Sequence, residues 1–335
     1  MRIIYFYNEE WEVEYVKSRV ANQDIIFKQG YLSQYPEFKD EEAEAISIFV
    51  TSHIGGEEMD RFPKLKFIAT RSTGFDHIDL SEAGKRGIKV SNVPSYGENT
   101  VAEQAFALLL CISRKIYDSY KQIEQGGKFS SEGLKGFDLR GKTIGIVGLG
   151  RIGIHVARIA RGFEMNILAY DKFPNAEAIT NYGVKYLTLD ELLAQSDIIS
   201  LHAPYMPETH HLINLDNVCK IKKGAYLINT ARGGLVDTGA LIKGLQDGNL
   251  AGAGLDVLEE ENFMLDELSL LNNPHPNADS LKTILENHYL IDHPRVIITP
   301  HNAFNTQEAI ERIVGTTVEN IISFTKGEEI NLVKM

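Results

Sequence analysis

The chain has 335 residues and a formal net charge of −12, with 43% apolar and 24% charged residues. This length is sufficient for two domains, and the composition is that of an ordinary globular protein. The acidic balance argues against a general binder of nucleic acids or of anionic membranes, and no apolar run approaches the roughly 20 residues of a membrane span.

The two cysteines, Cys111 and Cys219, have neither C-x-x-C nor zinc-site spacing. We therefore expect reduced packing residues in a cytoplasmic protein, and no metal site. The first residues, Met1–Asn8, are too short for the apolar core of a secretion signal and are predicted to form a first strand.

The first 98 residues alternate short apolar runs with helical patterns such as Trp11–Val20 and Gly56–Phe62. This alternation predicts parallel β-α-β units. No glycine-rich phosphate loop occurs here, so we expect a small α/β domain that does not hold a dinucleotide. The predicted strands are Ile3–Tyr7, Ile25–Lys28, Ile46–Thr51, Phe67–Thr70 and Ile88–Val90.

A long helix is predicted to open at Gly97-Glu98-Asn99-Thr100. Thr100 and Glu103 have the spacing of a capping box. The apolar stripe that follows predicts that the helix continues past Tyr120 and ends before Gly126. Such a length suggests a connector between domains or a subunit contact.

A glycine-rich turn links a buried strand, Thr143–Val147, to a helical pattern in the middle of the chain. Gly148, Gly150 and Gly153 have the spacing G-x-G-x-x-G. The first glycine permits a tight turn, the second lets a pyrophosphate approach the backbone, and the third lets the helix pack close to the strand. The free N–H groups of the helix then face the phosphates, so this stretch predicts dinucleotide binding.

Asp171 ends the next apolar run, Asn166–Tyr170, and lies 18 residues after Gly153. This is near the distance expected for an acid that accepts the ribose 2′-hydroxyl. A carboxylate would repel a 2′-phosphate, so NAD is favoured over NADP.

Regular β-α alternation continues from the fingerprint to His301 and predicts a full doubly wound dinucleotide domain. The long segment Leu258–Arg295 interrupts it, with short helices predicted at Leu265–Leu271 and Leu281–Leu285. A last helix is predicted from about Thr306 to Thr325 and is expected to return to the first domain. The six strands are Thr143–Val147, Asn166–Tyr170, Asp197–His202, Ala225–Thr230, Ala251–Val257 and Val296–Thr299.

Polar residues follow several of these strands, where ligands of open α/β sheets bind. Arg232 precedes two glycines, and its rigid fork suits a carboxylate. His301 can transfer a proton at neutral pH. A neighbouring acid would favour its protonated form, but the residues alone do not choose among Glu259, Glu260 and Glu261.

The chain resembles the D-isomer-specific 2-hydroxyacid dehydrogenases, and within them the D-lactate dehydrogenase branch. The resemblance extends over nearly the whole chain. It is carried by Arg-Ser-Thr-Gly-Phe-Asp-His-Ile-Asp (71–79), Val-Pro-Ser-Tyr-Gly-Glu-Asn-Thr-Val-Ala-Glu (93–103), Gly-Leu-Gly-Arg-Ile-Gly (148–153), Leu-His-Ala-Pro-Tyr-Met-Pro-Glu-Thr-His-His-Leu-Ile-Asn (201–214), Asn-Thr-Ala-Arg-Gly-Gly-Leu-Val-Asp (229–237), Gly-Leu-Asp-Val-Leu-Glu-Glu-Glu (254–261) and Ile-Thr-Pro-His (298–301).

The resemblance implies a catalytic triad of Arg232, Glu261 and His301, with Glu261 chosen by its place five residues after the aspartate of Gly-Leu-Asp. It implies substrate contacts at Thr73, Gly74, Tyr96, Arg232 and Phe304. The positions expected to bind NAD are Gly148, Gly150, Arg151, Ile152, Gly153, Asp171, His202, Ala203, Pro204, Thr209, Thr230, Ala231, Arg232 and Asp256.

The implied fold is a doubly wound Rossmann NAD-binding domain, residues 100–301, and a smaller flavodoxin-like substrate domain, residues 1–99 and 302–335, with a cleft between them. Family members are usually homodimers. The gap of 40 residues from Glu261 to His301 resembles the D-lactate branch, but Thr51 stands where that branch commonly has an aromatic residue.

The implied reaction is hydride transfer between NAD(H) and a small 2-ketoacid or D-2-hydroxyacid, pyruvate and D-lactate first. A larger 2-ketoacid or phosphite would suit the same triad. A non-catalytic NAD(H)-sensing protein is the alternative from another class.

Overall fold

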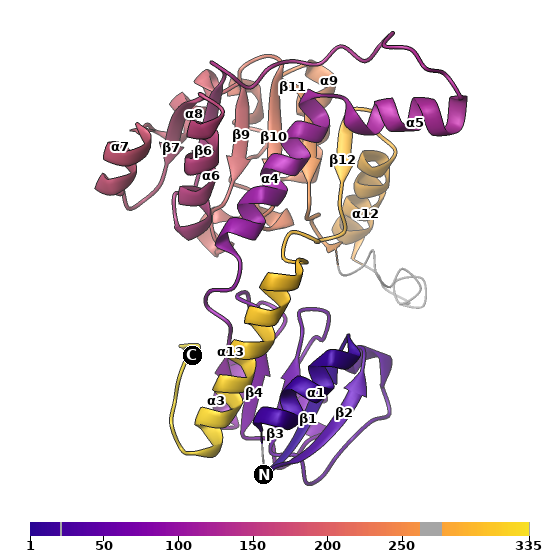
Figure 1. Ribbon diagram of the computed structural model, residues 1–335, viewed down its shortest axis with the longest axis vertical. Helices are drawn as coiled ribbons and strands as arrows, with labels where there is room; N and C mark the ends of the chain where they lie inside the picture. The colour runs from indigo at the N-terminus through magenta and orange to yellow at the C-terminus, as the bar shows by residue number, and fades with distance from the viewer. Residues whose placement is uncertain (21, 262–276, 335) are drawn as a thin grey trace. The chain divides into compact units, whose positions relative to one another are not determined.

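The computed structural model describes residues 1–20, 22–261 and 277–334 (Figure 1). The chain divides into two compact units, one of Met1–Gly97 with Asn305–Met335 and one of Glu98–Phe304. Each unit is built on one parallel sheet, so the predicted α/β class is confirmed.

The smaller unit holds a five-stranded sheet in the order β2-β1-β3-β4-β5, which is the flavodoxin-like order. Its strands are β1 (Arg2–Tyr7), β2 (Asp24–Gln29), β3 (Ala45–Ile48), β4 (Phe67–Thr70) and β5 (Lys89–Ser91). Its α-helices are α1 (Glu10–Arg19), α2 (Gly56–Asp60), α3 (Leu80–Lys85) and α13 (Gln307–Thr325).

Alternate side chains of β1 enter two different cores, because successive residues of a strand face opposite sides of the sheet. Ile4 and Phe6 pack in the cluster that includes Met59 of α2, whereas Ile3 packs with Val318 of α13 on the other face. The last helix of the chain therefore packs on the first sheet, where it contacts α1 and β4.

The larger unit holds a seven-stranded parallel sheet in the order β12-β11-β10-β9-β6-β7-β8. Counted along the chain from β6, the order of the first six strands is 3-2-1-4-5-6, that of a doubly wound dinucleotide-binding fold. The strands are β6 (Thr143–Val147), β7 (Asn166–Tyr170), β8 (Lys185–Tyr186), β9 (Ile198–Leu201), β10 (Ala225–Asn229), β11 (Leu250–Leu255) and β12 (Val296–Ile298).

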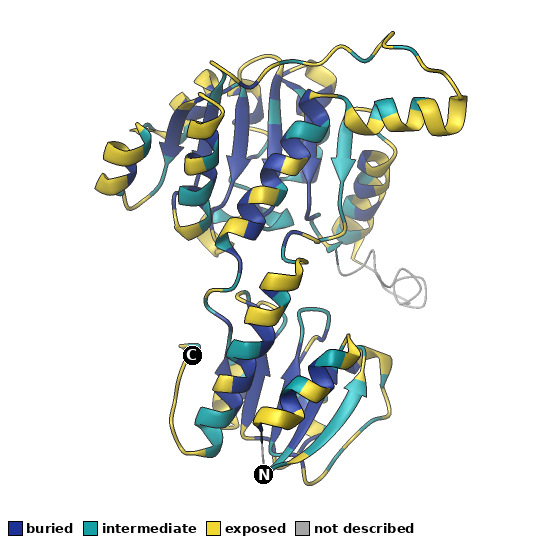
Figure 2. Ribbon diagram, viewed as in Figure 1, coloured by how far each residue is buried: buried dark blue, intermediate teal, exposed yellow. Residues whose placement is uncertain are grey.

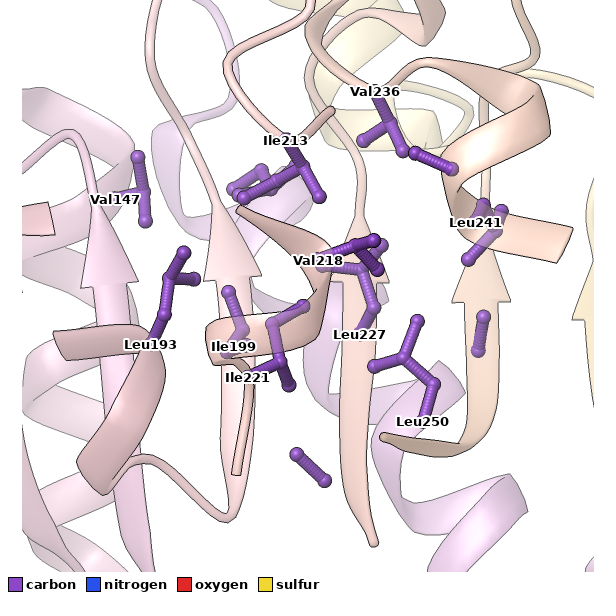
Figure 3. Packing of buried hydrophobic residues seen from close by; sticks show 14 of the residues in the cluster. Val147, Leu193, Ile199, Ile213, Val218, Ile221, Leu227, Val236, Leu241 and Leu250 are labelled. Atoms are coloured by element: carbon purple, nitrogen blue, oxygen red, sulfur yellow. The ribbon is translucent and has the colours of Figure 1, made fainter. Parts of the chain in front are cut away.

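Helices cover both faces of this sheet, with a buried apolar cluster under each group. Helices α4 (Glu98–Ser113) and α6 (Arg151–Gly162) pack on one face, over Ile146 and Ile198. Figure 3 shows the opposite face, where Ile199 and Leu227 of the sheet lie beneath the second group of helices. That group comprises α8 (Leu189–Gln195), α9 (Thr238–Asp247) and α12 (Ala278–Ile291); α7 (Ala176–Tyr182) lies next to α6.

The prediction of one helix from Glu98 past Tyr120 is wrong. The structure has two helices, α4 and α5 (Ile116–Gly126), separated at Lys115, whose φ of 55° is left-handed. The carbonyl of Ser113 accepts a hydrogen bond of 2.9 Å from the backbone N–H of Phe137, so a returning segment ends α4. The expected capping box is wrong as well, because Thr100 lies buried inside α4.

Several other boundaries differ from the prediction. Strand β8 (Lys185–Tyr186) extends the predicted six strands to seven. A run of two residues has no periodicity from which a strand could be predicted. Strand β3 ends at Ile48 instead of Thr51. The helix expected at Leu281–Leu285 is the 14-residue α12, which begins after the N-cap Asn277. The helix expected at Leu265–Leu271 lies outside the described residues.

Exposure corrects the prediction for the cysteines: both are free thiols, but Cys219 is exposed and Cys111 only partly buried. The burial pattern in Figure 2 places the cores at the two sheets and leaves α5 without a buried residue. Across residues 1–20, 22–261 and 277–334, no helix is both long and apolar enough to cross a membrane.

Candidate active site

The carboxyl ends of all seven strands of the larger sheet share one edge, because every pairing between them is parallel. After six of these strands the chain places a sequence-predicted site residue directly or within three residues. These residues are Gly148 after β6, Asp171 after β7, His202 after β9, Arg232 after β10, Asp256 after β11 and His301 after β12.

The glycine turn has the space that a dinucleotide requires. Gly148 has a φ of +91°, and a Cβ there would lie 2.5 Å from the backbone nitrogen of Ala203. A Cβ on Gly153 would lie 2.2 Å from the carbonyl oxygen of Gly148. Gly150, by contrast, is exposed at the N-cap of α6, and a Cβ there would meet no atom of the described residues within 4 Å. The turn is thus closed toward the protein and open where a pyrophosphate would approach.

Asp171 is held in place by the same turn. Its Oδ2 accepts the backbone N–H of Leu149 at 2.6 Å, and its Oδ1 accepts that of Phe173 at 2.7 Å. A carboxylate oxygen has a second acceptor position, so these bonds orient the group and leave it able to accept a ribose hydroxyl.

Two buried polar atoms near the ends of β9 and β10 have no hydrogen-bond partner among the described residues. They are Nδ1 of His202 and Oγ1 of Thr230. The other ring nitrogen of His202 lies 2.7 Å from Oγ of Ser200. Burial lowers the pKa of His202 to about 3, so the ring is neutral at physiological pH. Buried polar atoms are normally paired, and a bound polar ligand would supply the missing partners.

Arg232 projects from a turn that Asn229 closes. The side chain of Asn229, 1% exposed, accepts the N–H of Ala231 at 3.0 Å and donates to the carbonyl of Arg232 at 2.9 Å. One guanidinium nitrogen, Nη1, donates to the carbonyl of Ala231 at 2.8 Å. The backbone that carries the guanidinium fork is therefore fixed at the end of β10.

His301 and Glu261 form a direct imidazole–carboxylate contact. Nδ1 of His301 lies 2.7 Å from Oε1 of Glu261, and because a carboxylate only accepts, Nδ1 carries the shared proton. Nε2 is therefore the ring nitrogen that Glu261 does not contact. Oε2 of Glu261 accepts the N–H of Leu258 at 3.3 Å, which closes a short turn after β11.

Asp256 fastens the segment that carries His301. It is 0% exposed, and its carboxylate accepts the N–H groups of Asn302 at 2.9 Å and Ala303 at 2.8 Å as well as the hydroxyl of Thr299. Its carbonyl accepts the N–H of His301, whose φ of 49° is left-handed. Burial raises the pKa of the Asp256 carboxyl, although these hydrogen bonds oppose the shift. Each of these hydrogen bonds links Asp256 to another residue of the protein, so the carboxylate fixes the segment 299–303.

The remaining predicted positions divide between the two units. Thr73, Gly74 and Tyr96 belong to the smaller unit, and Phe304 to the larger. Oγ1 of Thr73 donates to the carbonyl of Val93 at 2.7 Å, so the turn around Gly74 is tied to the next segment. The other predicted NAD positions all lie in the larger unit: Arg151 and Ile152 at the start of α6, Ala203, Pro204 and Thr209 after β9, and Thr230 and Ala231 after β10.

The residues present fit an NAD molecule. The open space at Gly150, the exposed start of α6, the oriented Asp171 and the two unpartnered buried atoms lie along one edge of the sheet. Among the residues that the structure describes, no group of three or more histidine, cysteine or acidic side chains is arranged to hold a metal ion.

Sequence reasoning missed Asn229 and the anchoring contacts of Asp256. An Asn at the end of an apolar strand, with glycines four and five residues later, is a turn signal that could have identified Asn229. The contacts of Asp256 join residues more than 40 positions apart, and no local pattern predicts them.

Residues 106–303 match the NAD binding domain of the D-isomer specific 2-hydroxyacid dehydrogenases. A glyoxylate reductase of Thermococcus litoralis is 40% identical over 87% of this chain and 83% of its own. The D-lactate dehydrogenase kk1H of Curvularia clavata is 37% identical over 98% of this chain and 93% of its own.

Among solved structures, a D-lactate dehydrogenase of Aquifex aeolicus complexed with NAD and lactic acid is similar, with a TM-score of 0.83 and 36% identity. The similarity covers 97% of this chain and 96% of that one. The chain therefore belongs to the D-isomer specific 2-hydroxyacid dehydrogenase family, and it is an NAD-dependent oxidoreductase.

Proposed function

We propose that this protein catalyses the reversible reduction of a small 2-ketoacid to the D-2-hydroxyacid, with pyruvate and D-lactate as the preferred pair. The observation that carries the proposal is the contact of 2.7 Å between His301 and Glu261. It provides an oriented proton donor at the edge of the sheet where the dinucleotide turn also lies.

Each member of the proposed triad has one task. His301 donates a proton from Nε2 to the carbonyl oxygen during reduction and takes it back during oxidation. Glu261 holds the ring through Nδ1. Arg232 binds the substrate carboxylate through its fork and polarises the carbonyl. The nicotinamide of bound NAD(H) supplies or accepts the hydride.

The proposal assigns binding roles to the residues expected from the sequence. The larger unit binds NAD, with the glycine turn at the pyrophosphate and Asp171 at the adenosine ribose. The smaller unit binds the ketoacid, with the backbone N–H groups of Thr73 and Gly74 at its carboxylate. Tyr96 and Phe304 lie beside the rest of the substrate.

The proposed substrate preference rests on the relatives and on the size of the side chain at Thr51. The D-lactate dehydrogenases of Curvularia clavata and Aquifex aeolicus match nearly the whole chain, whereas the glyoxylate reductase of Thermococcus litoralis matches a shorter part at slightly higher identity. The relative from Thermococcus litoralis makes glyoxylate the second candidate. Thr51 is smaller than the aromatic residue common at this position in the D-lactate branch, and this makes a larger 2-ketoacid the third.

A substrate panel with purified protein tests the proposal. NADH oxidation is followed with pyruvate, 2-ketobutyrate, 2-ketoisocaproate and glyoxylate, and NADH binding is measured separately by fluorescence. We expect the highest kcat/KM with pyruvate. A higher value with glyoxylate would move the enzyme to the second candidate. NADH binding without oxidation on any ketoacid would contradict the proposed reaction.

We further propose a cytoplasmic homodimer. Helix α5 supports the dimer, because it has no buried residue and presents large apolar side chains to solvent, which monomeric proteins rarely expose together. The exposed side chains are Ile116 (54%), Tyr117 (53%), Tyr120 (64%) and Ile123 (51%).

A further inference from the structure

The carboxylate of Glu259 is fixed on both oxygens, although it belongs to a run of three acidic residues. Its Oε1 accepts from Nε2 of His211 at 2.5 Å, and its Oε2 accepts the hydroxyl of Thr238 at 2.9 Å and the backbone N–H of Thr238 at 3.3 Å. The side chain is 16% exposed. A solvated acidic loop would have none of these contacts.

The main chain at Glu259 is held as firmly as its side chain. Its carbonyl accepts the amide of Asn287 at 2.7 Å, and Asn287 is 0% exposed on α12. The peptide that joins Leu258 to Glu259 packs directly against Gly233. A Cβ at Gly233 would come within 2.3 Å of the backbone nitrogen of Glu259. The turn of Arg232 and the segment of Glu259 are thus packed against each other.

His211, the partner of Glu259, is itself part of a rigid arrangement. Its backbone N–H donates to the carbonyl of Gly234 at 2.8 Å, and Ile213 forms a parallel bridge with Val236. The ring stacks on that of His210 at 3.7 Å between centroids. His211 therefore belongs to the same packed layer as the chain that follows Arg232.

We infer that Glu259 is a positioning residue that holds the segment 258–261 so that the carboxylate of Glu261 meets the imidazole of His301. Contacts with His211, Thr238 and Asn287 fix the segment at Glu259. The backbone N–H of Leu258 then donates to the carboxylate of Glu261. The inference deepens the proposed function and rests on it, because it gives Glu259 a task only if Glu261 orients a catalytic histidine.

Glu259→Ala tests the inference, and Glu260→Ala is the matched control. Glu260 is exposed, carries the same charge and lies one residue away. We expect Glu259→Ala to lower kcat for ketoacid reduction by about 10- to 100-fold, because small displacements of reacting groups have effects of that size. The KM for NADH should stay near that of Glu260→Ala, whereas the melting temperature should fall, because His211 and Thr238 lose their acceptor.

Two further variants separate positioning from general damage. Glu259→Gln should recover most of kcat, because its amide can donate to Nε2 of His211 when the ring carries its proton on Nδ1, while its oxygen accepts from Thr238. His211→Ala removes the same contact from the other side without touching the acidic segment, so its kcat should also fall. It keeps the inference testable if Glu259→Ala does not fold.

A double-mutant cycle with Glu261→Gln gives the decisive readout. If Glu259 acts through Glu261, then Glu259→Ala costs little more in a chain that already carries Glu261→Gln. An equal additional loss in that background, or equal kcat values for Glu259→Ala and Glu260→Ala, would overturn the inference while the proposed function stands. Wild-type protein without activity on any ketoacid would overturn both.

Discussion

Arg232 is the residue whose chemistry is hardest to replace in the proposed reaction. Its guanidinium group is planar and binds a carboxylate through two parallel hydrogen bonds, which an ammonium group cannot reproduce. The backbone beneath it is fixed by Asn229. A substitution at Arg232 should therefore affect the substrate interaction more than the fold.

We expect Arg232→Lys to lower kcat/KM for pyruvate by about 10²- to 10³-fold, because lysine keeps the positive charge but loses the second parallel hydrogen bond, and removal of one such donor has an effect of that size. Initial rates of NADH oxidation measure the effect. Arg158→Lys, at an exposed position of α6, is the control and should leave the rate unchanged. A normal rate in Arg232→Lys would remove the bidentate contact from the mechanism.

His202 should make the stability of the protein depend on pH. The unfolded chain binds a proton at this histidine below about pH 6.5, whereas burial keeps the folded chain unprotonated there until about pH 3. The free energy of unfolding therefore decreases as the pH falls below 6.5. Between pH 7 and pH 5 this one group contributes a loss of about 2 kcal/mol.

Urea unfolding of wild type and His202→Gln at both pH values measures this contribution. We expect the variant to lose less stability than wild type on going from pH 7 to pH 5. The same loss in both proteins would show that His202 binds its proton equally in the folded and unfolded chain.

At the scale of elements, we expect the glycine turn and helix α6 to form the phosphate site. The turn is closed at Gly148 and Gly153 by contacts with the protein and open at Gly150. The helix N-terminus adds unpaired N–H groups and a partial positive charge. The two kinds of glycine should therefore respond differently to the same added methyl group.

Gly150→Ala should raise the dissociation constant of NADH at least about tenfold, or 1.4 kcal/mol, because the added carbon occupies the approach of the pyrophosphate. The melting temperature should not fall, since that carbon meets no atom within 4 Å in the part of the chain that the structure describes. Gly162→Ala, near the other end of α6, is equally open and should leave NADH binding unchanged. Fluorescence titration and thermal unfolding give both quantities.

Gly148→Ala provides the contrast. Gly148 has a φ of +91°, and the added Cβ would lie 2.5 Å from the backbone nitrogen of Ala203. The substitution should therefore lower the melting temperature. A stable Gly148→Ala together with unimpaired NADH binding by Gly150→Ala would contradict the proposed site.

At the scale of the whole molecule, the apolar face of α5 supports the proposed homodimer. Ile116, Tyr120 and Ile123 are spaced by four and three residues, so they lie on one side of the helix. An isolated helix with this face in water would be unfavourable, and a second copy of the chain would cover it.

Light scattering after size exclusion tests the dimer. Wild type should elute at twice the monomer mass, and Tyr120→Glu should move the mass toward that of the monomer, because a carboxylate is costly to bury. Ile179→Glu, on the exposed side of α7, is the control and should remain dimeric. A wild-type mass equal to the monomer would rule out the dimer under these conditions.

Much of the fold follows from local patterns. Apolar β-branched runs identify every strand except β8, and G-x-G-x-x-G with the following acid identifies the dinucleotide turn. These features are visible in the sequence because each depends on residues within about 20 positions of one another.

The site was only partly predictable. Arg232 and His301 stand out at strand ends, but the residues alone did not choose among the three glutamates. In the structure it is Glu261 that contacts His301, while Glu259 contacts His211. These pairs span 40 and 48 positions, respectively.

The sequence by itself thus determined the fold class, the dinucleotide turn and the residue types available at the strand ends. Only the tertiary structure decided where the helix after Glu98 breaks and what the buried carboxylate of Asp256 holds. The resemblance to the family already implied Glu261, and the structure shows its contact with His301. The physical reason is the range of the interactions. Turns and periodic apolar faces are encoded locally, whereas the hydrogen bonds that end α4 and orient His301 form only when distant segments pack together.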